Sequence, residues 1–151
     1  MKPLIVLITV SCLSLLTIKI TRGKYEFVFS GRIALSAMFV FSAMGHFTFT
    51  QGMALMIPEF IPFKTEIIYL TGGMEILFAI GLFFPDIRVP TAWLIIAFLI
   101  LALPANIYAS VKHIDIQKAT FDGNGLNYLW FRIPLQILFI VWTYLCAIKY
   151  K

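Results

Sequence analysis

Charged side chains are scarce in this sequence, and their scarcity argues against a soluble globular protein. Only 13% of the 151 residues are charged, whereas 61% are hydrophobic and the mean hydropathy is +0.94. A soluble domain is closer to half apolar and a quarter charged. The net charge of +5 comes from basic residues scattered through loops, with no stripe along one face. We therefore expect a membrane protein, with no nucleic acid as partner.

The sequence also lacks the cysteine and histidine patterns of redox and metal sites. Its two cysteines, Cys12 and Cys146, lie far apart in apolar segments and form no CxxC motif. Its two histidines, His46 and His113, are not a pair at helical spacing, and one histidine with one glutamate supplies too few metal ligands. We expect no metal site and no thiol exchange by this chain itself.

Five long apolar runs are what the sequence does contain. They cover residues 3–20, 32–56, 66–84, 91–111 and 128–148. Each has the ~20 residues that a helix needs to cross a bilayer. We predict an all-α transmembrane helical bundle, with an N-terminal transmembrane helix and basic loop (residues 1–28) and a four-helix membrane domain (residues 29–151). The first run could instead be a cleaved signal peptide, but only Lys2 precedes it and no A-x-A site follows, so we favour a retained helix.

Prolines and one threonine predict where these helices begin, end and bend. Pro58 and Pro62 break the second helix and form a stiff turn. Thr65 is the predicted N-cap of the third helix, and Pro90 suits the start of the fourth. Pro104 removes a backbone hydrogen bond within the fourth helix, so we expect a kink there.

Basic residues in the short loops predict the orientation. One side carries Lys19, Arg22, Lys24, Arg32, Arg88, Lys149 and Lys151, and the other carries Lys2, Lys64, Lys112, Lys118 and Arg132. This weak majority places the C-terminus in the cytoplasm and the N-terminus outside. We expect a multi-pass protein of a bacterial-type cytoplasmic (inner) membrane.

Polar residues inside the apolar runs are the main indication of function. An ionisable group in hydrocarbon costs at least ~2.5–3.5 kcal/mol on insertion scales, so it is retained where it has partners or a task. At about 1.5 Å per residue, the outer half of the bilayer holds His46, Glu75, Asn106, Arg132 and Gln136. Their common depth on four helices predicts one site.

Helical spacing adds two hydroxyl groups to this predicted site. Ser42 precedes His46 by four residues and Thr71 precedes Glu75 by four, so each pair shares a face. Small residues such as Gly72 beside them indicate helix-packing faces that point inward. The candidate ligand-binding residues are therefore Ser42, His46, Thr71, Glu75, Asn106, Arg132 and Gln136.

Structural explanations remain open for four of these residues. Glu75 and Arg132 could neutralise each other as a buried ion pair, or Arg132 could extend to lipid headgroups. His46 could bond a carbonyl of a neighbouring helix. Asn106 could bridge the backbone that Pro104 loosens.

Four segments resemble the core helices of DoxX-like membrane proteins. They are Gly31–Ala34 leading to Gly45–Phe47, then Thr71–Glu75, Leu103–Asn106 and Arg132–Gln136, and the resemblance covers residues 29–149. It implies a four-helix integral membrane bundle. Some members of that family are linked to thiosulfate oxidation with quinone as acceptor or to membrane complexes that handle thiol stress, and related eukaryotic proteins look like assembly chaperones. The N-terminal helix is an addition to the family's four-helix core.

Three functions follow from these residues and this resemblance. The first is binding of a small polar or amphipathic ligand of lipid or quinone type, with His46, Glu75 and Arg132 as anchors. The second is a membrane subunit of a quinone-linked oxidoreductase, in which His46 and Glu75 relay protons to or from a redox partner protein. The third is a membrane-protein assembly factor. No cofactor other than a quinone is implied, and whether the chain is an enzyme is left open.

Overall fold

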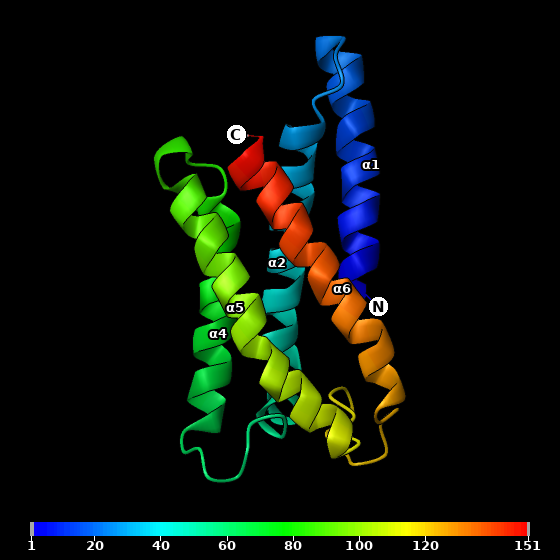
Figure 1. The fold of residues 1–151 in the computed structure, drawn as a ribbon, viewed down its shortest axis with the longest axis vertical. Helices are drawn as coiled ribbons and strands as arrows, with labels where there is room; N and C mark the ends of the chain where they lie inside the picture. The colour runs from blue at the N-terminus through cyan, green and yellow to red at the C-terminus, as the bar shows by residue number, and fades with distance from the viewer. Residues whose placement is uncertain (1, 151) are drawn as a thin grey trace.

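The computed structural model describes residues 2–150 as a bundle of helices (Figure 1). The elements are α1 (Lys2–Arg22), α2 (Phe27–Thr48), α3 (Thr50–Ala54), α4 (Lys64–Gly81), α5 (Pro85–Val111), α6 (Asn127–Thr143) and the π-helix η1 (Tyr144–Lys149). The predicted all-α helical bundle is confirmed. Met1 and Lys151, which the predicted domain bounds include, lie outside the described residues.

Successive long helices run in opposite directions along the bundle (Figure 1). One end holds the connections from α1 to α2 and from α4 to α5, together with the C-terminus. The other end holds the segments at residues 55–63 and 112–126. α1 begins partway along the bundle. The helices therefore form an up-and-down arrangement with two distinct ends.

Four of the five predicted spans are long and apolar enough to cross a membrane. They are α1, α2, α5 and the continuous helix formed by α6 and η1 (Asn127–Lys149). The run at residues 66–84 corresponds to α4, which is not among these four helices. Its 18 residues include Lys64, Glu66 and Glu75, which lower its hydropathy. The prediction that residues 66–84 form a further membrane span is therefore not borne out by the composition of α4, which lies against α2 in the bundle.

A single apolar core joins the long helices. Leu7 of α1, Leu35 of α2, Leu82 after α4 and Ile95 of α5 are all fully buried in it. The outward faces carry exposed apolar side chains such as Leu101. Apolar residues on both the inside and the outside are what a bundle in lipid requires, because the surrounding solvent is itself hydrocarbon.

The starts of α4 and α5 differ from the predictions. α4 begins at Lys64, and its N-cap is Phe63 in the left-handed conformation (φ 57°) rather than Thr65. α5 begins at Pro85, five residues before Pro90, because proline at the first helical position loses no intrahelical hydrogen bond. α5 then continues as one helix through Pro90 and Pro104 to Val111.

Candidate functional site

Four of the predicted site residues meet where α2 packs against α4. Ser42 and His46 come from α2, and Thr71 and Glu75 come from α4. Gly72 allows the two helices to approach here, because a Cβ atom at Gly72 would lie 2.9 Å from the Cβ of His46. We call these four residues the α2–α4 cluster.

Hydrogen bonds connect the α2–α4 cluster across the two helices. The Ser42 hydroxyl donates to Glu75 Oε1 at 3.1 Å. The Thr71 hydroxyl oxygen lies 3.0 Å from His46 Nδ1, which is also 3.2 Å from the carbonyl oxygen of Ile68. These contacts confirm that the spacing of four residues placed the hydroxyl groups on the same faces as His46 and Glu75.

Glu75 has one carboxylate oxygen without a hydrogen-bond donor. Its side chain is only 6% exposed, and Oε2 is buried without a partner. The nearest cationic group is His46, whose Nε2 lies 3.5 Å from Oε2, longer than an ordinary hydrogen bond. A buried acceptor left without a donor costs roughly 1–3 kcal/mol, and more when it is charged. A hydroxyl or amine group from another molecule would remove that cost.

The proton on His46 has two arrangements that the geometry permits. In one, Nδ1–H donates to the Ile68 carbonyl, and Nε2 faces Glu75. Nε2 is then an acceptor in the neutral imidazole and a donor in the doubly protonated one. In the other, the Thr71 hydroxyl donates to Nδ1 and Nε2–H points towards Glu75. In both arrangements Nε2 faces Glu75 Oε2, so the imidazole and the carboxylate lie beside each other.

Asn106 and Gln136 use their amide groups within the bundle. The Asn106 amide donates to the carbonyl of Ala102, one turn earlier in α5, at 2.9 Å. That carbonyl is not the one freed by Pro104, so Asn106 does not repair the backbone there. The Gln136 amide donates to the carbonyl of Leu99 and so joins α6 to α5. Both residues are buried, but neither is hydrogen bonded to the α2–α4 cluster.

Arg132 does not pair with Glu75. Its guanidinium group donates to the hydroxyl oxygen of Tyr128 at 2.9 Å and lies 5.6 Å from the centre of that ring. Among residues 2–150, no ion pair within 4 Å includes Arg132. The buried Glu75–Arg132 pair considered from the sequence is therefore wrong, since His46 is the residue beside Glu75.

A polar groove of about 490 Å³ near the end of α2 was not predicted. The stacked rings of Phe47 and Tyr69 line it on the helices, with centroids 5.8 Å apart. Lys118 lines it from the connection before α6 and lies 3.8 Å from the carboxylates of Asp115 and Asp122. The connection between α5 and α6 lies far from α2 in the sequence and meets it only in the folded protein. Residue spacing therefore could not predict the groove.

Local contacts order the connection that closes this polar groove. Gly52 of α3 packs against it so closely that a Cβ atom there would overlap the carbonyl oxygen of Ile116. A hydrogen bond from the Thr120 hydroxyl lowers the pKa of Asp122, so this exposed carboxylate stays charged beside Lys118. In the described part of the chain, no group of three His, Cys, Asp or Glu residues could hold a metal ion.

A family model described as "Domain of unknown function (DUF8561)" matches residues 35–147. The matched segment includes all four members of the α2–α4 cluster and begins after α1. No curated protein and no solved structure matches the chain.

Proposed function

The chain belongs to the family of the domain of unknown function DUF8561, and we propose that it binds a small polar or amphipathic ligand inside a membrane. The polar head of the ligand, of lipid or quinone type, binds at Ser42, His46, Thr71 and Glu75. The four apolar helices support a multi-pass membrane protein. We also propose that this membrane is the cytoplasmic (inner) membrane and that the cluster lies in its outer half.

The observation that carries this proposal is the unpartnered oxygen of Glu75. A buried carboxylate in a purely structural role would have both oxygens satisfied, because a half-satisfied polar network is less stable than an apolar core. Oε1 accepts from Ser42, whereas Oε2 has only a distant imidazole. The arrangement is therefore suited to a donor that arrives with a ligand.

The donor and acceptor groups define the kind of head that fits. Glu75 requires an O–H or N–H donor, and His46 can either donate or accept. A quinol hydroxyl or a lipid hydroxyl meets both requirements, and a quinone carbonyl can accept from a protonated His46. Exposed apolar side chains of α4, among them Leu70 directly before Thr71, are available for the apolar part of the ligand.

Glu75→Gln tests the proposal because it keeps the shape of the side chain and removes the charged acceptor. Binding of ubiquinol-1 to the protein in nanodiscs should weaken by roughly 10–100-fold, since a hydrogen bond to a charged group contributes ~1.5–3 kcal/mol. Equilibrium dialysis of the quinol measures the affinity, and circular dichroism checks the helix content.

Glu66→Gln is the matched control, because Glu66 lies in the first turn of the same helix and is exposed. It should leave quinol binding unchanged. If Glu75→Gln folds and binds as tightly as the wild type, ligand binding at this cluster is excluded. If it loses its helix content, Glu75 is structural.

A second candidate is the membrane subunit of a quinone-linked oxidoreductase, as the DoxX-like resemblance implies. The position of His46 Nε2, 3.5 Å from Glu75 Oε2, favours it, because a small side-chain movement would bring the two groups within hydrogen-bonding distance for proton transfer. In that case His46→Ala should slow quinone turnover by the complex with its redox partner. Unchanged turnover would count against this candidate while leaving ligand binding intact.

A further inference from the structure

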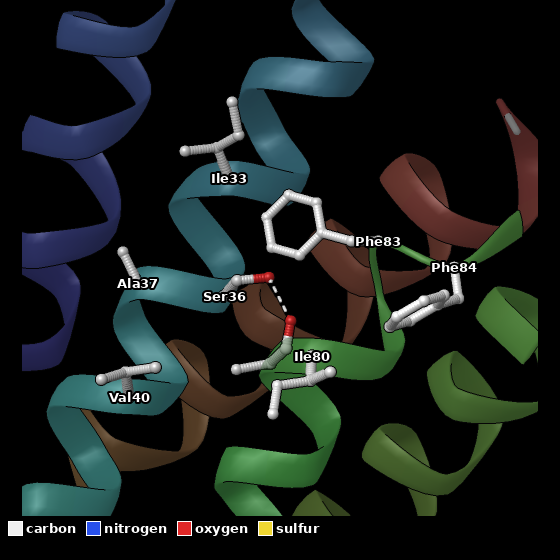
Figure 2. A pocket seen from close by; sticks show the side chains of 8 residues that line it. Ile33, Ser36, Ala37, Val40, Ile80, Phe83 and Phe84 are labelled. Atoms are coloured by element: carbon white, nitrogen blue, oxygen red, sulfur yellow. Dashed lines mark hydrogen bonds between the residues drawn. The ribbon is translucent and has the colours of Figure 1, made fainter.

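An apolar groove of about 420 Å³ lies between α2 and α4, separate from the α2–α4 cluster (Figure 2). Its walls include Ile33, Ala37, Val40, Ile80, Phe83 and Phe84. The Ser36 hydroxyl in the groove donates to the carbonyl of Ala79 at 3.0 Å, so this polar group is already satisfied. The groove therefore suits a hydrocarbon chain and offers nothing to a polar molecule.

Two arginines lie at the end of this groove. Arg32 directly precedes Ile33, and Arg88 Nε donates to the carbonyl of Leu82, next to the groove residue Phe83. Neither arginine forms an ion pair with a carboxylate in residues 2–150. Arg32 Nε is buried and has no hydrogen-bond partner. Two guanidinium groups outside any ion pair therefore lie next in the chain, or by a hydrogen bond, to the residues at one end of the groove.

The charge of the whole molecule is concentrated at the same end of the bundle. The described residues of that end include six basic residues, Lys19, Arg22, Lys24, Arg32, Arg88 and Lys149, and two acidic ones, Glu26 and Asp86. At the opposite end, counted with Lys2 at the start of α1, five basic residues, Lys2, Lys64, Lys112, Lys118 and Arg132, nearly balance the four acidic residues Glu59, Glu66, Asp115 and Asp122. An anion is therefore attracted to the end where the groove lies.

We propose that this face binds one anionic phospholipid. Its phosphate contacts Arg32 and Arg88, and one of its acyl chains lies in the groove between α2 and α4. The length of the groove supports this occupant, because Ile33 to Val40 spans about 10 Å along α2, which takes the chain from the membrane surface towards the middle of a leaflet. Arginine also matches a phosphate with two parallel hydrogen bonds.

The test uses nanodiscs that contain equal amounts of phosphatidylglycerol and phosphatidylcholine. Native mass spectrometry of the released protein counts which lipid stays bound. The wild type should retain phosphatidylglycerol in preference to phosphatidylcholine. Arg88→Gln should lower that preference about five-fold, the effect of one basic residue near a membrane surface. Ala37→Leu, which fills the groove, should reduce retention of both lipids several-fold.

Two control variants separate the groove from general effects. Arg22→Gln removes a charge at the same end, but Arg22 pairs with Glu26 instead of bordering the groove. Ala97→Leu adds the same bulk at an exposed position of α5. Both should bind lipid as the wild type does.

The proposal is overturned if the wild type retains the two lipids equally. It is also overturned if Arg22→Gln lowers the preference as much as Arg88→Gln. Either result leaves quinol binding at Glu75 unaffected, since that is measured with a different probe at a different site.

Discussion

Gly72 and Gly73 are neighbours in α4 but meet very different surroundings. A Cβ atom at Gly72 would lie 2.9 Å from the Cβ of His46, whereas at Gly73 it would meet no atom within 4 Å. Gly72 therefore sets how closely α4 approaches α2, and with it the separation of His46 from Glu75. Gly73 has no such role and only weakens the helix.

Gly72→Ala should destabilise the bundle by ~1–3 kcal/mol, because the added methyl group overpacks the contact between α2 and α4. Gly73→Ala should be neutral or stabilise it by ~0.5–1 kcal/mol through higher helix propensity. Unfolding with sodium dodecyl sulfate in mixed micelles, followed by circular dichroism, measures both. Equal effects of the two substitutions would show that the close approach at Gly72 is unimportant.

Residue spacing predicted part of the candidate site because a helix period fixes which side chains share a face. The spacing of four residues predicted that Ser42 shares a helix face with His46, and that Thr71 shares one with Glu75. The structure brings all four side chains together. Spacing does not fix how each helix is rotated about its axis relative to the others. Arg132 therefore matched Glu75 in depth but turns to Tyr128 of its own helix.

At the scale of elements, α1 is held in the bundle by its packing along α2. Leu7 is fully buried in the common core, and the Ser30 hydroxyl donates to the carbonyl of Ser11 at 2.9 Å. Ser14 is also hydrogen bonded to Ser30. Only Leu7 and Ile18 of α1 are buried, so these two positions anchor the helix to the core most firmly.

Leu7→Ala should therefore loosen α1 by about 2–4 kcal/mol, because it leaves a cavity in the core. Ile8→Ala is the control, since Ile8 is the next residue of α1 and its side chain is 51% exposed. Limited proteolysis at the connection after Arg22, in detergent, reports how firmly α1 is held. The expectation fails if the two variants are cleaved at the same rate.

The helices were predictable from apolar runs, but their first residues were not, because neighbouring residues suit a helix start equally well. Pro85 and Pro90 both suit a first helical turn, and the sequence alone did not show that the helix could begin at the earlier one. Thr65 is a good N-cap by type, yet Phe63 in a left-handed conformation ends the preceding turn first. The lower hydropathy of α4 follows from Glu75, the same residue that defines the site.

For the whole molecule, the two ends of the bundle differ in charge, and this difference predicts how it inserts. Lysine and arginine in short loops are retained on the cytoplasmic side of a membrane. The end that holds Arg32 and Arg88 has the basic excess, whereas the opposite end is nearly balanced when Lys2 is counted with it. We therefore expect the connection between α1 and α2 to face the cytoplasm and the connection between α5 and α6 to face outside.

Single cysteines test this orientation in a variant in which Cys12 and Cys146 are replaced by alanine. Lys24→Cys and Asn124→Cys place a thiol in the two connections, at positions that are both exposed. A membrane-impermeant maleimide added to intact bacterial cells should label Asn124→Cys, whereas Lys24→Cys should react only after the cells are broken open. The opposite pattern would place the α2–α4 cluster in the cytoplasmic half of the membrane. The ligand would then have to enter from that leaflet, because the cluster lies nearer the end of the bundle that carries Asn124.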